Sequence, residues 1–200
     1  MISITVDLIP INPFSRDGGK LKAKKGIVMH YTASPGAPAA NIGRYFSNLR
    51  HQNPNDSAKN RYAGAHYSVD RFTIIQSIPI NERAYHCGST SYTKEALDKL
   101  GSYPNNTTIG IEMCIEKDGS IHEDTFRNAA DLVAYLVKVK EFPEVIFTHK
   151  GVVGWKDCPL PWVKKPSEFE RFRRAVSERL RRRLPLHRLF PSLRRMKIWQ

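Results

Sequence analysis

The sequence predicts an α/β protein: a single domain with a central mixed β-sheet flanked by helices, plus a basic amphipathic C-terminal helix. Three observations predict it. Short β-prone apolar runs alternate with longer helical patterns. A chain of 200 residues can bury one full core and carry a modest appendage. Hydrophobic residues make up 40% of the chain, and no run approaches the ~18 to 20 apolar residues of a membrane span. We expect residues 1–165 to form the domain and residues 166–200 the helix and tail.

The first predicted strand is Gly26–His30 (GIVMH), a buried run whose C-terminal end presents His30. A helix is predicted over Ala39–Arg50, because apolar residues recur there at helical spacing. These residues are Ile42, Tyr45, Phe46 and Leu49. The polar, turn-rich segment His51–Arg61 is expected to be a surface loop.

The middle of the chain predicts a β-hairpin and a short helix. Ala65–Val69 and Thr73–Ile78 are β-prone segments that flank a three-residue turn, Asp70-Arg71-Phe72. The short helix is predicted over Thr93–Leu100.

The next strand, Thr108–Ile115 (TIGIEMCI), is predicted to be central because it is strongly β-prone. A turn is predicted at Asp118-Gly119. The long helix Glu123–Glu141 follows and places its apolar residues on one face. Val145–Thr148 is predicted as another short buried strand.

Pro166 marks a predicted boundary. Ser167, with Glu170 three residues later, matches the capping box of a helix N-terminus. Apolar residues follow at spacings of three and four, which predicts an amphipathic helix whose other face is mostly arginine. These residues are Phe169, Phe172, Val176, Leu180 and Leu184. Pro185 is expected to stop the helix, and Leu186–Gln200 to be loosely ordered.

The net charge of +13 is concentrated at the C-terminal end. Residues 163–200 hold 13 Lys and Arg against 3 Asp and Glu, a net +10, which leaves +3 for residues 1–162. Two interpretations stay open, a solvated helix face or a patch for a polyanion. The three cysteines favour free thiols over a disulfide framework, although a bridge between Cys87 and Cys114 stays possible. The N-terminus has no recognisable secretory signal.

His30, His149 and Cys158 are candidate metal ligands. Two imidazoles and one thiolate make a three-ligand zinc set, which leaves a fourth position for a water whose pKa the metal lowers. Each residue alone has an ordinary interpretation, as a hydrogen-bonded structural histidine or a buried core cysteine. The spacing His-x8-Cys matches no compact zinc finger, so spacing by itself is only suggestive.

Glu112 and Lys156 are candidate catalytic residues. A carboxylate inside TIGIEMCI is costly to bury unless it is paired or functional, and beside a metal it can act as general base and proton donor. The alternative is a strand glutamate that pairs with a surface lysine. Lys156 lies two residues before Cys158 and can stabilise an oxyanion, although a lysine in a loop is more often simply solvated.

Five motifs occur in a fixed order: HYT, AHYSVD followed by IIQSIP, ERAYHCG, NNTTIGIEMC and THKGVVGWKDCP. Together, over about residues 20–165, they resemble the zinc-dependent N-acetylmuramoyl-L-alanine amidases of the type-2 amidase family. That family is related to peptidoglycan recognition proteins, and the likeness is strongest to phage endolysin and prophage-type amidases.

The resemblance implies that His30, His149 and Cys158 bind Zn2+, that Glu112 is the catalytic carboxylate and that Lys156 stabilises the oxyanion. His86, in AYHCG, and Asn106 would line the substrate cleft, although a structural histidine and a loop-capping asparagine are the alternatives. One branch of the family has a catalytic tyrosine where this chain has Ala65, and that branch lacks the strand glutamate. The resemblance therefore favours a glutamate-based mechanism here.

The implied activity is cleavage of the amide between the lactyl group of N-acetylmuramic acid and L-alanine in peptidoglycan. We expect a monomer, made in the cytoplasm without a signal peptide and released to the cell wall by a holin-type lesion. The basic tail stands where endolysins commonly carry a wall-binding domain, and it is a candidate contact for an anionic wall polymer. The alternatives are a non-catalytic peptidoglycan-binding module, which characteristically lacks the cysteine ligand, and a basic nucleic-acid-binding protein.

Overall fold

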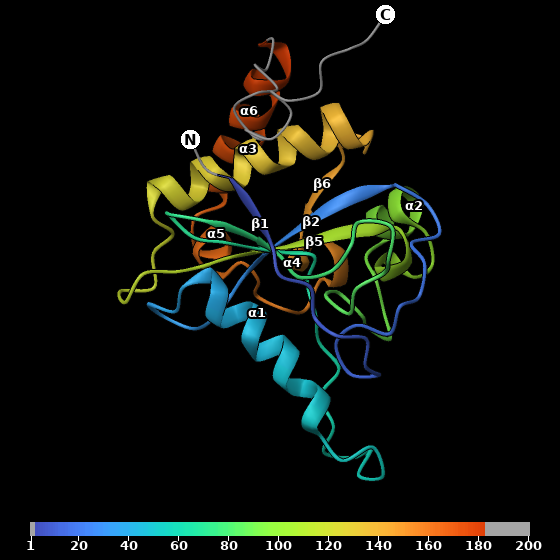
Figure 1. The fold of residues 1–200 in the computed structure, drawn as a ribbon. Helices are drawn as coiled ribbons and strands as arrows, with labels where there is room; N and C mark the ends of the chain where they lie inside the picture. The colour runs from blue at the N-terminus through green and yellow to red at the C-terminus, as the bar shows by residue number, and fades with distance from the viewer. Residues whose placement is uncertain (1–2, 183–200) are drawn as a thin grey trace, which may run out of the picture.

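The computed structural model describes residues 3–182, which form a six-stranded mixed sheet with helices on both faces (Figure 1). The strand order is β1-β4-β3-β5-β2-β6, and among these described strands only the β3–β4 pair is antiparallel. The predicted α/β class is confirmed. The strands are β1 (Ile4–Val6), β2 (Gly26–Tyr31), β3 (Tyr67–Val69), β4 (Ile74–Gln76), β5 (Thr108–Met113) and β6 (Ile146–Thr148).

Six α-helices and two short 3-10 helices lie among the described residues. The α-helices are α1 (Ala39–Asn48), α2 (Lys94–Leu100), α3 (Glu123–Lys140), α4 (His149–Val153), α5 (Leu160–Lys164) and α6 (Pro166–Arg181). The 3-10 helices are η1 (Leu49–His51) and η2 (Pro104–Asn106). None of these described helices is long and apolar enough to cross a membrane.

The predicted strands and helices are all present, with bounds that differ by a few residues. The predicted hairpin is β3–β4, and the turn at Asp118-Gly119 is closed by a hydrogen bond from the Gly119 amide to the Glu116 carbonyl. β1, α4 and α5 were not predicted. The helices α4 and α5 have five residues each, which is too short to show a helical period.

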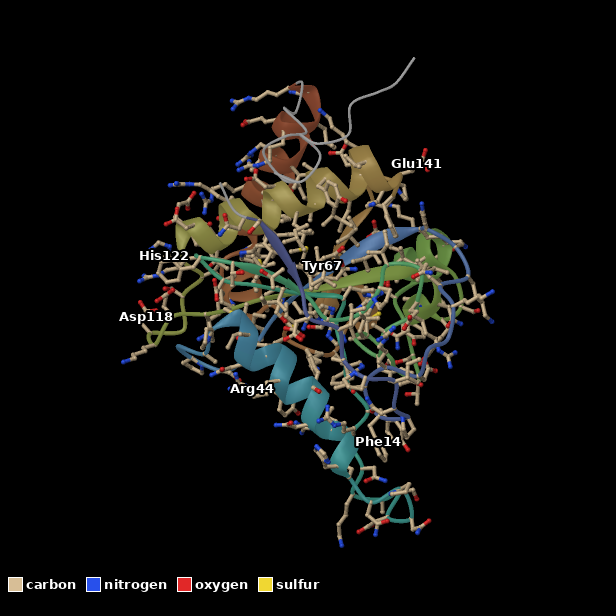
Figure 2. The ribbon with its side chains drawn as sticks, in the orientation of Figure 1. Phe14, Arg44, Tyr67, Asp118, His122 and Glu141 are labelled. Carbon is tan, nitrogen blue, oxygen red and sulfur yellow. The ribbon has the colours of Figure 1, made fainter. Side chains whose placement is uncertain are left out.

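The sheet separates two layers of packing. α3 and α6 cover one face and α1 the other (Figure 1). Along β2 and β5, alternate residues such as Met29 and Ile111 are fully buried in the core beneath α3. Tyr67 of β3 joins this core, while Arg44 on α1 points away from the sheet (Figure 2). The opposite faces of β2 and β5 are therefore free to present polar side chains between the sheet and the loops beside α1.

Helix α6 belongs to the same core as the sheet. The side chains of Phe172 and Val176 are fully buried. The Phe172 ring packs against Phe126 of α3, with ring centroids 5.3 Å apart, and against Trp162 of α5, at 5.0 Å. The predicted division at residues 165 and 166 stays a prediction, but the hydrophobic core is continuous across it.

The predicted capping box at Ser167 and Glu170 is wrong. The helix begins at Pro166, with Lys165 as its N-cap, so Ser167 already lies inside the first turn, and the N-cap makes no side-chain hydrogen bond. Proline is well suited to the first helical position, because its fixed φ matches the helix and its missing N–H needs no partner there. Glu168 instead forms an ion pair with Lys165, at 3.1 Å.

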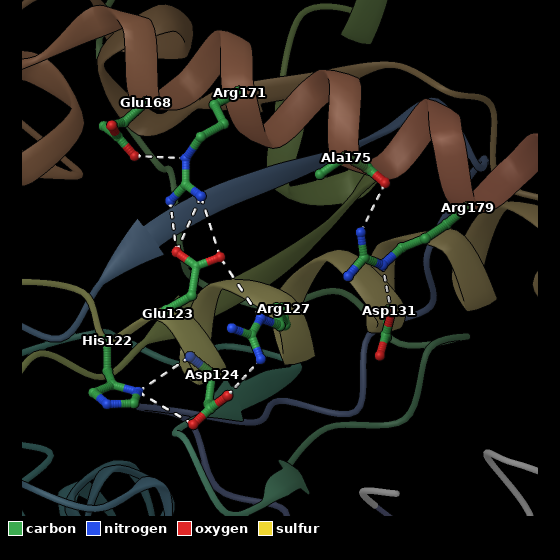
Figure 3. A network of polar contacts seen from close by, with 9 residues as sticks. All are labelled: His122, Glu123, Asp124, Arg127, Asp131, Glu168, Arg171, Ala175 and Arg179. Atoms are coloured by element: carbon green, nitrogen blue, oxygen red, sulfur yellow. Dashed lines mark hydrogen bonds and ion pairs between the residues drawn. The ribbon is translucent and has the colours of Figure 1, made fainter.

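Polar contacts clamp α6 onto α3 along the edge of this core (Figure 3). The Arg171 guanidinium donates to Glu123 at 3.0 Å and to Glu168 at 2.9 Å, and it lies 3.8 Å from the centroid of the Phe126 ring. Further along, Arg179 pairs with Asp131. The exposed arginines of α6 are Arg173, Arg174 and Arg181, and Arg182 at its C-cap is also exposed. Leu184, Pro185 and the predicted tail Leu186–Gln200 lie outside the described residues.

We expect Phe172→Ala to lower the free energy of unfolding by about 3 to 5 kcal/mol, because the substitution leaves a cavity among two aromatic rings. Arg173→Ala, one residue away on the exposed side, is the matched control and should change it by less than about 0.5 kcal/mol. Urea denaturation of the three proteins measures both values. Equal stabilities for Phe172→Ala and the control would mean that α6 is not part of the cooperative core.

Two partly buried ion pairs hold the N-terminal segment against the segment that precedes His86. Arg16 makes a bidentate contact with Glu82, with both distances 2.7 Å. Asp17 accepts hydrogen bonds from Arg83 and from the Tyr85 hydroxyl. These contacts fix the course of residues 82–85 on their way to the cavity described below.

The Asp17 contacts predict a loss of stability in acid. Burial by itself raises the pKa of Asp17, but the hydrogen bonds from Arg83, the Gly19 amide and Tyr85 outweigh it and lower the pKa to about 2. The unfolded carboxyl titrates near 3.9. The contribution to stability is therefore present above about pH 4 and is lost as the pH falls through 2.

After allowance for solvent screening, we expect this contribution to be about 1 to 2 kcal/mol. Asp17→Asn should be less stable than the natural chain by about that amount at pH 6, and the difference should vanish toward pH 2. Urea denaturation across this range measures it. A difference that is the same at both ends of the range would show that ionisation of Asp17 does not stabilise the fold.

Candidate metal centre and active site

Three parallel strands bring polar residues to the same end of the sheet. His30 near the end of β2 stands in register with Glu112 on β5. On the other side of β2, Met29 is in register with Thr148, so His149 follows β6 at the level of His30. Side chains in register on neighbouring parallel strands point to the same face, which places His30 and Glu112 together on the face opposite α3.

His149 is held at the first turn of α4. The hydroxyl of Thr148 caps this helix by accepting a hydrogen bond from the Gly151 amide at 2.9 Å. The returning loop is tied to the same turn, because the Lys150 amide donates to the carbonyl of Cys158 at 2.9 Å. The Lys150 ammonium also pairs with Asp157 at 2.7 Å. The loop therefore carries Cys158 back to His30 and His149.

The donor atoms of His30, His149 and Cys158 all lie within 4.8 Å of one another, and all three side chains are buried. His30 Nδ1 is 3.7 Å from Cys158 Sγ. For a tetrahedral zinc ion, with Zn–N near 2.05 Å and Zn–S near 2.3 Å, the expected separation of N and S is about 3.6 Å. The spacing of these donors suits a metal of that size.

Buried polar atoms at this site also fit a bound metal. Both ring nitrogens of His149 and Oε2 of Glu112 are buried and have no hydrogen-bond partner among the described residues. Leaving a buried donor or acceptor unpaired costs about 1 to 3 kcal/mol, so three such atoms in one place call for an explanation. A metal ion with a bound water would satisfy them.

The protonation of the donors fits a cation site. Burial lowers the pKa of His149 to about 4, with a further contribution from the charge of Lys156, so its imidazole is neutral and can ligate. Burial lowers the pKa of His30 well below its usual value. Burial raises the pKa of Cys158 to about 12 and that of Glu112 to about 8. A metal cation would favour the charged thiolate and carboxylate and so oppose the effect of burial.

The family model described as N-acetylmuramoyl-L-alanine amidase (Amidase_2) matches residues 20–161, which include all three donors and Glu112. The chain belongs to this amidase family.

Named amidases of Bacillus are similar to most of the chain. A probable N-acetylmuramoyl-L-alanine amidase of Bacillus licheniformis is 42% identical over 184 residues, covering 92% of this chain and 49% of the relative. The amidase BlyA of Bacillus subtilis strain 168 is 36% identical over 188 residues, 90% of this chain and 48% of the relative. The chain thus spans about half the length of these relatives.

Solved amidase domains have the same fold. The catalytic domain of XlyA is 29% identical, with a TM-score of 0.65, and the match covers 86% of this chain and 98% of that domain. A mutant endolysin from Bacillus subtilis is 28% identical, with a TM-score of 0.66, over 88% of this chain and 99% of the other. α6 lies beyond the part of the chain that the amidase family model matches.

The amidase-family site opens into a cavity of about 780 Å³. Six of the seven predicted site residues line it: His30, His86, Glu112, His149, Lys156 and Cys158. Asn106 is not among the lining residues, whereas its neighbour Asn105 is. The side chain of Asn105 accepts hydrogen bonds from the amides of His86 (3.2 Å) and Cys87 (2.9 Å), so it holds the loop that carries His86.

The far wall of the amidase cavity was not predicted. It is formed by aromatic and polar residues of α1 and of the irregular segments around it: Tyr45, Phe46, Arg61, Tyr62, Tyr85 and Tyr103. The hydroxyl of Tyr45 accepts a hydrogen bond from Arg61 at 2.8 Å, which links α1 to the predicted surface loop. The signal available in the sequence was the presence of tyrosines in otherwise polar segments. Cys87 and Cys114, which were predicted to be free buried thiols, are both buried and form no disulfide within the described residues.

Proposed function

We propose that this protein is a zinc-dependent peptidoglycan hydrolase that cleaves the amide between the lactyl group of N-acetylmuramic acid and L-alanine. Family membership supports the reaction class. The observation that carries the proposal is the convergence of His30, His149 and Cys158 beside the strand carboxylate Glu112, with ring nitrogens on His149 that are buried and have no partner among residues 3–182.

The metal would be held by one nitrogen of His30, one nitrogen of His149 and the sulfur of Cys158. Three protein ligands of this kind are typical of catalytic rather than structural zinc, because a fourth position stays free. Bound there, zinc would supply a water of lowered pKa and a Lewis acid for the scissile carbonyl. The position of this site at the bottom of an open cavity gives a bulky glycopeptide access to it.

Glu112 is proposed to be the general base and acid. It accepts a proton from the attacking water and later delivers a proton to the leaving amine of L-alanine. Its register with His30 supports this role, because the carboxylate stands one strand away from a metal donor on the same face of the sheet. Burial raises the pKa of Glu112 to about 8, and the nearby charge of Lys156 lowers it. A metal cation beside it would lower this pKa again, so the carboxylate would be charged and able to take a proton from water.

Lys156 is proposed to stabilise the oxyanion that forms on the attacked carbonyl. Lys156 lines the cavity, and in the sequence it lies between the metal donors His149 and Cys158. Its positive charge lowers the pKa of both His30 and His149. A charge that acts on both donors also acts on a carbonyl oxygen held between them. The neighbouring Lys150 is paired with Asp157, so its charge is already neutralised, and we assign the role to Lys156.

Digestion of purified peptidoglycan tests the proposed reaction. The expected result is new N-terminal alanine, detected by amino-group labelling and sequencing, with no new reducing sugar ends. New reducing ends without new amino groups would identify a glycosidase. Wall binding without release of either product would identify a non-catalytic recognition module.

The exposed arginines of α6 support an accessory proposal, which is contact with an anionic wall polymer. Residues 183–200 of the predicted basic helix and tail lie outside the described residues. Action on the wall, with holin-type release from the cytoplasm, is proposed from the resemblance to endolysins.

A further inference from the structure

His30 is the first member of a chain of hydrogen bonds that leads away from the metal donors. Its Nε2 lies 3.0 Å from Nδ1 of His86. On the other side of that ring, Nε2 of His86 lies 3.1 Å from the hydroxyl oxygen of Thr108. The Thr108 hydroxyl in turn contacts the carbonyl of Pro104 at 2.7 Å. His30, His86 and Thr108 are all buried.

The carbonyl of Pro104 decides which atom donates in each hydrogen bond of this series. A carbonyl only accepts, so the single hydroxyl proton of Thr108 goes to Pro104. The Thr108 oxygen must then accept a proton from Nε2 of His86. A neutral imidazole with its proton on Nε2 has a bare Nδ1, which accepts from Nε2 of His30. Nδ1 of His30 is therefore left without a proton, and this is the atom that lies 3.7 Å from Cys158 Sγ.

Within residues 3–182, no competing donor reverses this order. The thiol of Cys87 lies 4.0 Å from Nε2 of His86, a much longer contact. It is 3.2 Å from Oδ1 of Asn105 and donates there. That same oxygen accepts from the amide of His86, so Asn105 fixes the backbone that carries the ring.

The His86 ring also packs closely against the backbone of the sheet. It lies directly over Gly110 of β5, where a Cβ atom would come within 2.5 Å of His86 Cγ. Gly110 is not in a left-handed conformation, so glycine is required there by contact with the ring rather than by backbone geometry. The residue two positions along the same strand face is Glu112.

We infer that His86 is a positioning residue: it fixes the tautomer and orientation of His30 so that the bare Nδ1 points at the metal. This inference rests on the proposed zinc site and adds a supporting shell to it. Such partners of metal-binding histidines raise the basicity of the ligand, and losing one typically weakens metal binding by 10- to 100-fold.

The test is zinc affinity, measured by competition with a chromophoric chelator, in His86→Phe and His86→Asn. Phenylalanine keeps the ring volume but removes both nitrogens, so we expect zinc to bind about 10- to 100-fold more weakly. Asparagine places Oδ1 where Nδ1 was, so it should restore much of the affinity. Thr108→Val, which removes only the hydroxyl that sets the tautomer, should give a smaller loss than His86→Phe.

Two further measurements separate positioning from packing. Nitrogen-15 NMR of the zinc-loaded natural protein should show His30 with its proton on Nε2 and the metal on Nδ1, and the opposite assignment would overturn the inference. Gly110→Ala, which keeps all the hydrogen-bonding groups but crowds the ring by the contact above, should also weaken zinc binding. Thermal unfolding of the metal-free variants reports any loss of stability separately.

The outcomes also distinguish this inference from the proposed function. If His86→Phe binds zinc as tightly as the natural protein and only KM for peptidoglycan rises, His86 is a substrate contact and the inference fails while the function stands. If His86→Asn is no better than His86→Phe, the acceptor at Nδ1 is unimportant and the inference fails. If the natural protein binds no zinc at all, the proposed function itself is overturned.

Discussion

Replacing Glu112 by glutamine is expected to lower the rate of amide hydrolysis by on the order of 10² to 10⁴-fold, the usual contribution of a general base or acid. Glutamine has nearly the same shape, but it cannot take a proton from water or return one to the leaving amine. Oε2 of Glu112 is buried and has no hydrogen-bond partner in the part of the chain that the structure describes, so the variant loses no hydrogen bond shown for that atom. Release of N-terminal alanine from peptidoglycan measures the rate.

Glu116→Gln is the matched control, because this glutamate follows the same strand but sits at the surface, 4.0 Å from Arg71. It should hydrolyse peptidoglycan at the natural rate. Zinc content, measured by elemental analysis, should be unchanged in both variants. Near-full activity of Glu112→Gln with zinc bound would contradict the assignment of Glu112 as the base. Loss of zinc from this variant would indicate that Glu112 is a metal ligand instead.

Removal of the metal is expected to abolish hydrolysis altogether, and added zinc should restore it. Without the metal, the cavity retains Glu112 and Lys156 but lacks a water acidic enough to attack an amide at neutral pH. Zinc that binds the folded chain at a concentration 1,000 times its Kd should also stabilise it by about 4 kcal/mol. Thermal unfolding with and without chelator gives a second readout, which is independent of activity.

The variant Cys158→Ser tests whether the proposed ligands are the residues that bind the zinc. Since loss of a supporting residue costs about 10- to 100-fold in metal affinity, loss of the ligand itself should cost more than about 100-fold. Cys114→Ala is the control, because Cys114 is equally buried but packs in the apolar cluster beside α1 and does not line the cavity. Activity that survives both exhaustive chelation and Cys158→Ser would exclude a zinc mechanism.

The sequence indicated the strand-borne part of the site well, for a physical reason. His30 and His149 each follow an apolar run, and Glu112 interrupts one, so each is marked by contrast with its neighbours. Parallel strands of one sheet end at one edge, which is why residues so far apart in the chain meet. The roles of these residues stay predictions until the experiments above are done.

The loop-borne part was harder to predict, because irregular segments have no period to read. Asn106 was expected in the cleft, but the cavity is lined by Asn105, one residue earlier in η2. Consecutive residues of a 3-10 helix point about a third of a turn apart. No pattern in the sequence shows which of the two asparagines faces the cavity. The partnership of His30 with His86 depends on two rings meeting from distant segments, which the sequence does not indicate either.

The buried face of α6 has a practical consequence for protein engineering. A fusion that grafts a new targeting module onto this chain should place its junction after Arg182, not at Pro166. A cut at Pro166 would expose the apolar surfaces of α3 and α5 that Phe172 and Val176 now cover, and exposed patches of this kind promote aggregation. The smallest portable unit of this chain is therefore longer than the segment that the family shares.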